Sequence, residues 1–331
     1  MKKSELIYSY LRDIPSLGMS LLPTPLHRLN NMSARLSADL YCKRDDLTAF
    51  AFGGNKTRKL DYLVMDAIIN GYDSLITFGA VQSNWCRMTS TAGRVNGLDV
   101  FLILSGKKPG KETANLLLDR MTGAEITFTE NTDRDDIIKE VNRKILELET
   151  QGRKPYYMPV GGSVARGSLG YIRAMAEIVE YSENSGVDFK EIIVASGSAG
   201  TQAGLVAGQV ICGWQGRISG MAVSRIKAEQ EPKVFEIAKD SLDFVGYEYD
   251  EELVSSIVHV DDSYLGEGYR IITLACRQAI EEFARYEGIF LDEVYTGKAA
   301  AGLIDYAGKG DFSDGGAVLF IHTGGNIQLF E

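Results

Sequence analysis

The chain has 331 residues, 45% of them hydrophobic and 24% charged, which is typical of a globular protein of about two domains. Its formal net charge of −10 argues against a nucleic-acid or anionic-membrane surface, and no apolar run is long enough for a transmembrane helix. The 3 histidines exclude a histidine-rich metal centre, and the 4 cysteines are scattered without a CxxC pair, as in a reduced protein. We therefore expect a cytoplasmic protein with no metal site, since charged residues also interrupt the N-terminus where a signal peptide would be apolar.

Short apolar strands alternate with Gly-rich turns and helices along the chain. The pattern predicts strands at 40–43, 74–78, 100–104, 125–128, 192–194 and 317–321, and a strand ending at 291–292. It predicts helices at 60–68, 113–121, 135–148, 202–212 and 299–303, and one that begins near Ser83. This alternation favours parallel crossovers in a doubly wound sheet, in which ligands bind beyond the carboxyl ends of the strands. Four Gly- or Ser-rich turns are expected at those ends, at 53–56, 79–84, 196–201 and 323–325.

Lys56 lies in the most informative of these turns. Glycines free the backbone before it, Asn55 suits a helix N-cap, and the pattern over 60–68 places Lys56 in a first helical turn. The positive end of the helix dipole and the neighbouring basic residues would lower the pKa of Lys56, and Schiff-base chemistry requires a neutral amine. The alternative is a solvated surface lysine in a basic turn.

Three other features each have two interpretations. The turn 196–201 offers backbone N–H groups and hydroxyls to a phosphate, or it is a tight turn that lets helix and sheet pack. Ser83 is a helix N-cap, or its hydroxyl faces a reacting carbon in an anion site for a substrate carboxylate. Tyr295 is a core aromatic or a site residue, while a solvated first helical turn suffices to explain Lys298.

Six motifs occur in order: GGNKTRKL from Gly53, GAVQSN from Gly79, PVGGS from Pro159, SGSAGTQAGL from Ser196, LDEVYTGK from Leu291 and FIHTGG from Phe320. Together they resemble the 1-aminocyclopropane-1-carboxylate deaminase and D-cysteine desulfhydrase family, pyridoxal-phosphate enzymes of the tryptophan synthase β-like fold type II. The resemblance runs from about Pro23 to Glu331. It implies an α/β fold with two open, twisted, mostly parallel sheets flanked by helices. It also implies a large cofactor-binding domain of 1–52 and 160–331, a small α/β domain of 53–159, and an active site in the cleft between them.

The resemblance implies a role for each motif residue. Lys56 would hold the aldehyde of pyridoxal 5′-phosphate and act as the base at the substrate α-carbon. The implied cofactor contacts are Lys56, Lys59, Asn84, Ser198, Ala199, Gly200, Thr201 and Thr296, with Asn84 at the 3-oxygen and Thr296 at the pyridine nitrogen. The implied substrate contacts are Gln82, Ser83, Asn84, Trp85, Gly162 and Thr323. The implied catalytic residues are Lys56, Ser83, Tyr269 and Tyr295.

Two threonines distinguish branches of the family. Cyclopropane-opening deaminases carry Glu where this sequence has Thr296 and Leu where it has Thr323, whereas the D-cysteine desulfhydrase branch resembles this sequence at both positions. A carboxylate keeps the pyridine nitrogen protonated and the ring a strong electron sink, whereas a threonine leaves a weaker one. A weaker sink suffices for a good leaving group such as a thiol. We therefore expect a lyase that converts D-cysteine to pyruvate, hydrogen sulfide and ammonia.

Some alternatives remain open. Trp85, Val164 and Arg270 replace the His, Asn and Gly usual in the family, so cysteate, another β-substituted amino acid or 1-aminocyclopropane-1-carboxylate could be the substrate; Arg270 is expected to be exposed. A nucleotide-dependent oxidoreductase would need a GxGxxG motif, which is missing. A non-catalytic binding protein conflicts with the intact set of Lys56, Ser83 and Tyr295. By resemblance alone we expect a homodimer with a small amino-acid substrate and no nucleic-acid or membrane partner.

Overall fold

The computed structural model describes residues 1–312 and 315–331, and the chain divides into two compact units. The first unit comprises residues 1–14, 20–55 and 163–326, and the second comprises 15–19, 56–162 and 327–331. In the described ranges no helix has the length and apolar character needed to cross a bilayer. The same residues contain no cluster of three or more His, Cys, Asp or Glu side chains suited to a metal ion.

The first unit contains a sheet of 6 strands among its described residues, in the order β1-β2-β10-β7-β8-β9. The strands are β1 (Leu26–Arg28), β2 (Asp39–Arg44), β7 (Phe189–Ser196), β8 (Arg217–Ala222), β9 (His259–Asp261) and β10 (Ala317–His322). Only the β1–β2 pair of this described sheet is antiparallel. All six residues of β10 are buried, as expected for a parallel strand covered on both faces. The polypeptide therefore returns through helices between the parallel strands, and turns gather at their carboxyl ends.

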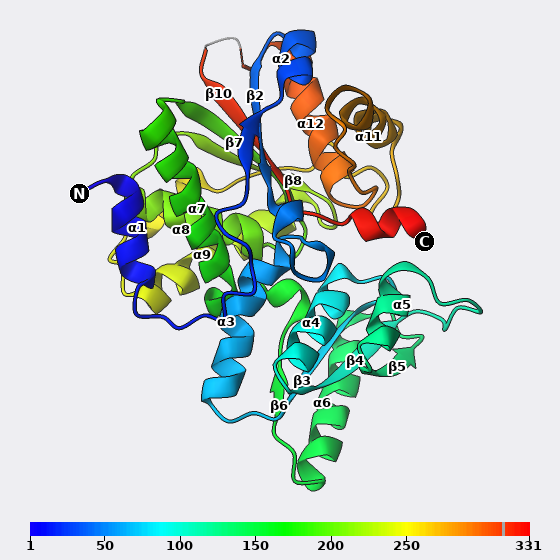
Figure 1. The fold of residues 1–331 in the computed structure, drawn as a ribbon. Helices are drawn as coiled ribbons and strands as arrows, with labels where there is room; N and C mark the ends of the chain where they lie inside the picture. The colour runs from blue at the N-terminus through cyan, green and yellow to red at the C-terminus, as the bar shows by residue number, and fades with distance from the viewer. Residues whose placement is uncertain (313–314) are drawn as a thin grey trace. The chain divides into compact units, whose positions relative to one another are not determined.

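Helices cover both faces of this sheet. They are α1 (Lys3–Leu11), α2 (Asn30–Leu36), α7 (Ala165–Ser185), α8 (Gly200–Cys212), α9 (Lys227–Val245), α10 (Glu251–Ile257), α11 (Leu274–Glu287) and α12 (Thr296–Lys309). Figure 1 shows α7, α8 and α9 on one side of the sheet and α2, α11 and α12 on the other. Two short 3₁₀ turns, η1 (Asp45–Leu47) and η2 (Phe50–Phe52), follow β2. A last one, η4 (Asn326–Phe330), begins in the first unit and ends in the second.

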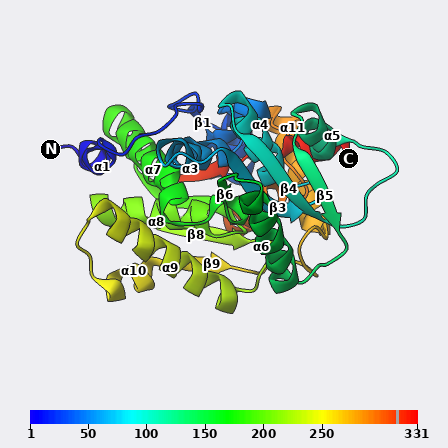
Figure 2. The same ribbon diagram turned by 90° about the horizontal axis from the view of Figure 1, so that it is seen from below.

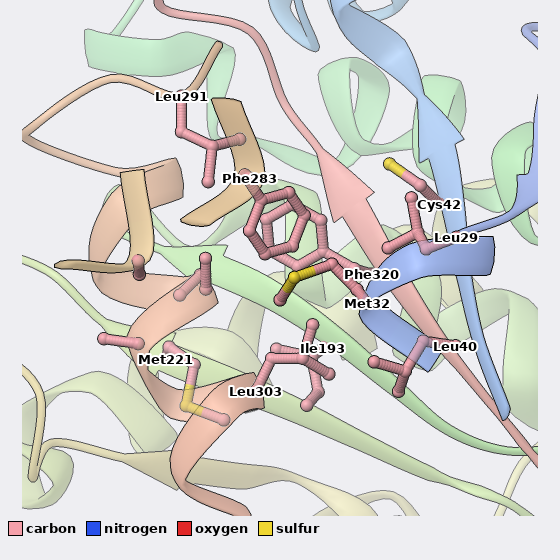
Figure 3. Close-up of a cluster of buried hydrophobic side chains, with 14 of the residues drawn as sticks. Leu29, Met32, Leu40, Cys42, Ile193, Met221, Phe283, Leu291, Leu303 and Phe320 are labelled. Carbon is pink, nitrogen blue, oxygen red and sulfur yellow. The ribbon is translucent and has the colours of Figure 1, made fainter. Parts of the chain in front are cut away.

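One hydrophobic core cluster of the first unit lies between the sheet and α2, α11 and α12. Figure 3 shows Phe283 of α11 against Phe320 of β10, and the two ring centroids are 5.3 Å apart. Met32 of α2, Ile193 of β7 and Leu303 of α12 belong to the same buried cluster. Because these side chains come from three helices and two strands, the core fixes α12 against the sheet.

The second unit contains a sheet of 4 parallel strands among its described residues, in the order β5-β4-β3-β6. The strands are β3 (Ser74–Ala80), β4 (Asp99–Ser105), β5 (Glu125–Thr129) and β6 (Pro155–Tyr157). The helices are α3 (Lys56–Ile69), α4 (Asn84–Val95), α5 (Ala114–Met121) and α6 (Arg134–Thr150), and the 3₁₀ turn η3 spans Val160–Gly162. Figure 2 shows α6 running along β3 and β4.

Alternate residues of the second sheet face different helices. Ile76 of β3 and Phe101 of β4 form a buried cluster with Ile137 of α6. Their neighbours Leu75 and Val100 face α4, where a Cβ on Gly93 would lie 3.0 Å and 2.3 Å from their side chains. This period of two is the pattern of a strand buried on both sides.

The structure confirms most of the predicted elements and corrects three expectations. The residues 291–292 do not end a strand, because Asp292 precedes and caps α12. The helix expected at 299–303 begins at Thr296 and ends at Lys309. Lys298 is not a solvated residue before that helix but a fully buried residue inside it. Arg270 is exposed, as expected.

Candidate active site

The turn between β7 and α8 is built to leave backbone N–H groups available. Ala199 has a φ of +79°, and α8 begins at Gly200 without a side-chain cap. Ser163 holds the turn, because its hydroxyl donates to Ser198 Oγ at 2.7 Å and accepts from the Gly200 N–H at 3.2 Å. Ser163 takes the Gly200 N–H, and the N–H groups that follow it at the start of α8, beside two hydroxyl groups, suit an anion such as a phosphate.

Two further turns of the first unit lie next to this one. Asn55 Nδ2 donates to Thr201 Oγ1 at 3.0 Å, and the Asn55 backbone N–H donates to the Thr323 carbonyl at 3.0 Å. A Cβ on Gly324 would lie 2.7 Å from the Cα of Gly54, so only glycine permits this approach. The structure therefore brings the predicted residues Thr201 and Thr323 to one residue, Asn55, which directly precedes Lys56.

His322 fixes the conformation of the turn that follows β10. Its ring is fully buried; Nδ1 accepts the Gly324 N–H at 3.2 Å and Nε2 lies 3.0 Å from the Phe290 carbonyl. These two contacts assign the proton to Nε2. Burial lowers the pKa of His322, so the ring stays neutral, and it serves as a structural support for Thr323.

Tyr269 and Tyr295 form a pair in the first unit. Their hydroxyl oxygens are 2.6 Å apart, and the rings meet edge to face with centroids 6.1 Å apart. Burial raises the pKa of Tyr295 well above its usual value, and the Tyr269 hydroxyl raises it further. At neutral pH Tyr295 therefore keeps its proton and can donate it, but cannot serve as a base.

The Thr296 hydroxyl is committed to Asp292. It donates to Asp292 Oδ1 at 2.6 Å and accepts the Asp292 backbone N–H at 2.9 Å. The same carboxylate accepts the backbone N–H groups of Val294, Tyr295 and Thr296, each at 2.8 Å. Asp292 therefore caps α12 and fixes the positions of Tyr295 and Thr296 together.

Lys56 and Lys59 lie one turn apart on α3 of the second unit. Lys56 is the first residue of this helix, as predicted. Lys59 is buried, and its ammonium donates to the Gly161 carbonyl at 3.0 Å. Burial lowers the pKa of Lys59 well below its usual value, and the nearby Lys56 lowers it further. Among the described residues no carboxylate pairs with the Lys59 ammonium. A bound anion would therefore compensate its buried positive charge.

A hydrogen-bond network of the second unit orients the Asn84 amide. Its Oδ1 accepts from Asn115 Nδ2 at 3.1 Å and from Arg87 Nη2 at 3.4 Å. Two donors on one atom identify it as the oxygen, so the Nδ2 group points the other way, where it donates to Gln328 Oε1 at 3.1 Å. Asn84 therefore presents a donor, as a contact to a phenolate-type oxygen requires.

The Gln82 amide is used within the second unit. Its Oε1 accepts the Asn115 N–H at 2.9 Å, and its Nε2 donates to the Thr113 carbonyl at 3.2 Å. The side chain thus holds the N-terminal end of α5. Ser83 caps α4 by accepting the Cys86 N–H at 3.2 Å, which leaves the hydroxyl proton of Ser83 available for donation.

Trp85 is buried beneath η3. Its indole N–H donates to Thr77 Oγ1 at 2.8 Å, and Thr77 in turn donates to the Met158 carbonyl at 2.6 Å. Gly162 has a φ of +57°, and a Cβ there would lie 2.8 Å from the Trp85 ring. The tryptophan therefore fixes the position of Gly162 and requires a glycine there.

Sequence reasoning missed four residues of these networks, namely Ser163, Asn115, Asp292 and Gln328. Ser163 and Asp292 stood inside recognised motifs, so they could have been weighed as hydrogen-bonding partners. Asn115 and Gln328 carried no such indication, because their partners are 31 and 244 residues away in the chain.

The α/β architecture, the start of α8 in the first unit and the lysines at the start of α3 in the second unit are typical of a class of enzymes that use a phosphorylated cofactor and a lysine. The chain belongs to the family of pyridoxal-phosphate dependent enzymes, whose sequence model matches residues 18–324. Its cofactor is therefore pyridoxal phosphate, and it is an enzyme of the group that contains 1-aminocyclopropane-1-carboxylate deaminases and D-cysteine desulfhydrases.

Individual relatives agree with this assignment. A Pyrococcus furiosus protein provisionally named 1-aminocyclopropane-1-carboxylate deaminase is 43% identical over 98% of this chain and 96% of its own. The D-cysteine desulfhydrase of Salmonella typhi is 40% identical over 97% of both chains. The crystal structure of an ACC deaminase homologue superposes with a TM-score of 0.90 at 40% identity, covering 98% of this chain and 96% of that chain. The crystal structure of a T.th. threonine deaminase shares the fold, with a TM-score of 0.65 at 15% identity over 97% of both chains.

The described residues fit this cofactor. The uncapped start of α8 with the Ser198 and Thr201 hydroxyls suits the phosphate in the first unit. In the second unit, Lys59 is a buried cation without a carboxylate partner among the described residues. Asn84 Nδ2 is a donor oriented by Asn115, as the 3-oxygen requires. The start of α8 and Lys59 suit the phosphate, and Asn84 suits the 3-oxygen.

Proposed function

We propose that the protein catalyses α,β-elimination from a small β-substituted amino acid and that D-cysteine is its substrate. D-Cysteine and one water molecule would give pyruvate, ammonia and hydrogen sulfide. The observation that carries this proposal is threonine at both 296 and 323, where cyclopropane-opening relatives resemble this chain but carry Glu and Leu. The identity of 40% with a D-cysteine desulfhydrase supports it.

We assign the covalent attachment of the cofactor and the removal of the α-proton to Lys56. Bound pyridoxal phosphate supplies an electron-withdrawing ring that stabilises negative charge at the substrate α-carbon. The base must be a neutral amine in the working enzyme, and the first turn of a helix next to Lys59 is an electrostatic environment that disfavours an ammonium. Tyr295 is unsuited to the same task, because its raised pKa keeps the phenol protonated.

Ser83 and Asn84 orient the reactants in this proposal. The Ser83 hydroxyl accepts from Cys86 and so retains its proton for the substrate carboxylate, while Asn84 Nδ2 donates to the 3-oxygen of the cofactor. Gln82 acts by holding the start of α5, including Asn115, which in turn orients Asn84. Trp85, Gly162 and Thr323 complete the proposed substrate site.

The tyrosine pair is assigned to the departing sulfur. When the Cβ–S bond breaks, its electron pair leaves with sulfur, and a thiolate needs a proton to depart as hydrogen sulfide. Only one hydroxyl proton can lie between the two tyrosine oxygens, which are 2.6 Å apart, so the other proton is directed away from this bond. The raised pKa keeps Tyr295 protonated, so the phenol can stabilise the negative charge that develops on sulfur by a hydrogen bond.

Thr296 supports a substrate with a good leaving group. Its hydroxyl carries no charge of its own and is bonded to Asp292, unlike the carboxylate that the cyclopropane-opening branch carries at this position. A neutral hydroxyl beside the pyridine nitrogen gives a weaker electron sink. Elimination of a thiol can proceed with a less electron-withdrawing cofactor ring, whereas opening a cyclopropane ring cannot.

Turnover of D-cysteine by the purified protein tests the proposal. Sulfide and pyruvate should form in equal amounts, and Lys56→Ala should lose both the products and the absorbance band of the covalently attached cofactor. A panel of D- and L-cysteine, cysteate, β-chloroalanine, serine and 1-aminocyclopropane-1-carboxylate identifies the preferred substrate. If cysteate is the preferred substrate, the proposed elimination reaction stands and the proposed leaving group is wrong. Faster ammonia release from the cyclopropane substrate would favour the deaminase alternative, and no turnover above Lys56→Ala would reject the enzyme assignment.

The assembly and the location are also proposals. A homodimer is proposed by resemblance alone, and light scattering that gives twice the mass of one chain would support it. A cytoplasmic location is proposed from the same resemblance and from four cysteines that are all free and buried. Fractionation of the source cells tests the location.

A further inference from the structure

Lys298 is a buried cation that the proposed chemistry does not use. Its side chain is fully buried in the first turn of α12, three residues after Tyr295. The ammonium donates to the Leu265 carbonyl at 2.7 Å and to the Gly268 carbonyl at 2.8 Å. Among the described residues it has no carboxylate partner. Two neutral carbonyl groups are thus the partners that hold the charge in place.

This is an unfavourable place for a lysine. The start of a helix carries a partial positive charge, and burial penalises an ammonium, so the pKa of Lys298 is lowered. A lysine needed only for packing could be replaced by methionine at no electrostatic cost. The hydrogen bonds to the two carbonyls are what a methionine could not supply.

The carbonyls belong to the loop that carries Tyr269. This loop spans 262–273, between β9 and α11, and contains no helix or strand. Its tip is exposed, and Arg270 has a φ of +64°, which is strained for a residue other than glycine. The Gly268 carbonyl belongs to the peptide bond that links Gly268 to Tyr269, so Lys298 holds the loop at the residue before the tyrosine.

We propose that Lys298 is a positioning residue that holds the 262–273 loop against α12 and thereby places the Tyr269 hydroxyl on the Tyr295 hydroxyl. One end of the tyrosine pair is fixed by α12, which Asp292 caps, and the other end is fixed by the Lys298 ammonium. The Tyr264 hydroxyl of the same loop donates to Asp305 of α12, but Tyr264 lies five residues before Tyr269. The bond from the Ile271 N–H to the Gly268 carbonyl, at 3.3 Å, lies within the loop. Lys298 thus supplies a contact between α12 and the loop at the residue that adjoins Tyr269. The catalytic consequence rests on the proposed role of the tyrosine pair.

Lys298→Met tests the proposal by a measurement that does not need activity. The methionine keeps the apolar volume and removes the ammonium, so amide hydrogen exchange over 262–273 should rise at least tenfold, while exchange in β7 and β10 stays unchanged. Lys190→Met is the matched control, because Lys190 is an exposed lysine of the same unit that pairs with Asp188. The control should exchange as the wild type does. Unchanged exchange of the loop in Lys298→Met would overturn the proposal.

The kinetic arm of the test uses Tyr269→Phe. Lys298→Met and Tyr269→Phe should each lower kcat/KM for the preferred substrate at least tenfold, and the double variant should be no worse than the worse single variant. Additive losses would mean that Lys298 acts elsewhere and would overturn the positioning role. If Lys298→Met does not fold, Lys298→Gln replaces it; its shorter amide keeps one donor group, so loop exchange should rise less than tenfold, and unchanged exchange would overturn the proposal.

The two proposals fail in different ways. If the wild type has no activity on the panel but loop exchange rises in Lys298→Met, the proposed substrate is wrong and the anchoring of the loop stands. If the wild type is active and loop exchange is unchanged, the anchoring is wrong and the proposed function stands.

Discussion

Two buried lysines of this protein have no carboxylate partner among the described residues, and each lies near a residue of the proposed site. Lys59 and Lys298 donate instead to backbone carbonyls. Buried ammonium groups without a counter-ion lower the stability of a fold, and residues with shifted pKa values are more common at functional sites than elsewhere. Asp119 of the second unit is a buried acid with a shifted pKa, and Ser90 donates to it.

Asp119 should make the stability of the second unit depend on pH. Ser90 donates to its Oδ1 at 2.9 Å, whereas Oδ2 has no hydrogen-bond partner among the described residues. Burial raises the pKa of Asp119 to about 7. The folded state then binds a proton that the unfolded chain releases near pH 4, so the free energy of unfolding falls as pH rises from about 4 to about 7. The full loss is on the order of 4 kcal/mol and is reached above pH 7.

Urea unfolding of wild type and Asp119→Asn at pH 5 and pH 8 measures this effect. Of the 2 tryptophans, only Trp85 belongs to the second unit, so a Trp214→Phe background makes fluorescence report on that unit. The free energy of unfolding of Asp119→Asn, measured relative to that of the wild type, should increase from pH 5 to pH 8. Parallel pH profiles for the two proteins would contradict the prediction.

The residues of the proposed site were predictable where local sequence carried the chemistry. The position of Lys56 at the start of a helix followed from glycines, a polar cap residue and helical periodicity, all close together in the chain. Lys298 could not be predicted in this way, because its partners are 33 and 30 residues away and are backbone carbonyls. Any residue type offers a carbonyl, so the sequence contains no indication of such a bond.

At the scale of elements, two helices of the first unit approach closely through glycines. A Cβ on Gly204 of α8 would lie 2.3 Å from the Ser168 carbonyl oxygen of α7, which is backbone and cannot rotate away. A Cβ on Gly208 would lie 2.6 Å from the Met175 Cβ. The start of α8 supplies the proposed phosphate contacts, so this close packing fixes the helix that positions them.

Gly204→Ala and Gly308→Ala should have opposite effects on stability. Alanine favours a helix over glycine by about 1 kcal/mol, so the helical position alone predicts stabilisation in both cases. Gly308 of α12 is exposed, and a Cβ added there would meet no atom within 4 Å, so Gly308→Ala should stabilise by about 0.5–1 kcal/mol. Gly204→Ala must push α7 away and should destabilise by about 1–3 kcal/mol. Urea unfolding followed by circular dichroism measures both effects, and equal effects would contradict the packing argument.

The buried Asp292 cap should contribute more to the free energy of unfolding than an exposed helix cap does. Asp292→Asn exchanges one acceptor oxygen for an N–H₂ group and leaves buried N–H groups of α12 without an acceptor, which costs about 2–3 kcal/mol. Asp250 caps α10 at an exposed position through the Glu252 N–H at 2.9 Å, so Asp250→Asn should cost about 0.5 kcal/mol or less. Urea unfolding of the two variants tests the difference. A similar cost for both would show that burial of the cap does not matter.

The elements that sequence reasoning did not predict lack clear boundary residues. The helix α7 begins after Val164, which cannot cap with its side chain, and α9 contains Pro232 in its second turn. The apolar Leu291 before Asp292 resembled a strand end, but the Asp292 side chain caps α12 from three residues before the N-cap position at Tyr295. Continuously apolar parallel strands such as 317–321 were predicted, since such a run needs no cap, whereas the parallel strand β8, which contains Ser219 and Gly220, was not.

At the scale of the whole molecule, the proposed cofactor contacts are distributed over both units. The fold class and the family were predictable, because six motifs keep their order across the chain and the α/β alternation is regular. The unit to which a short segment belongs could not be predicted. Residues 15–19, for example, join the second unit through backbone contacts such as the bond from the Leu17 N–H to the Asp61 carbonyl at 3.0 Å. Nothing in the composition of these segments distinguishes them from a linker.

Removal of the cofactor should lower the melting temperature, and the phosphate should account for most of the difference. A ligand at 100 times its dissociation constant stabilises by about 2.7 kcal/mol, which is roughly 5–10 °C for units of this size. Calorimetry on the apoprotein, before and after addition of pyridoxal 5′-phosphate, should show this rise. Pyridoxal, which lacks the phosphate, should give a much smaller one, because the start of α8 and the buried Lys59 would then remain without an anion.

Two variants separate the contributions to that shift. Lys59→Met removes a buried cation, so its apoprotein should melt no lower than the wild-type apoprotein, yet pyridoxal 5′-phosphate should stabilise it less. Lys56→Ala should also reduce the shift but retain a difference between the phosphorylated and unphosphorylated compounds, because it removes the covalent bond and leaves the phosphate contacts in place. Equal shifts with pyridoxal and pyridoxal 5′-phosphate in the wild type would show that neither α8 nor Lys59 binds the phosphate.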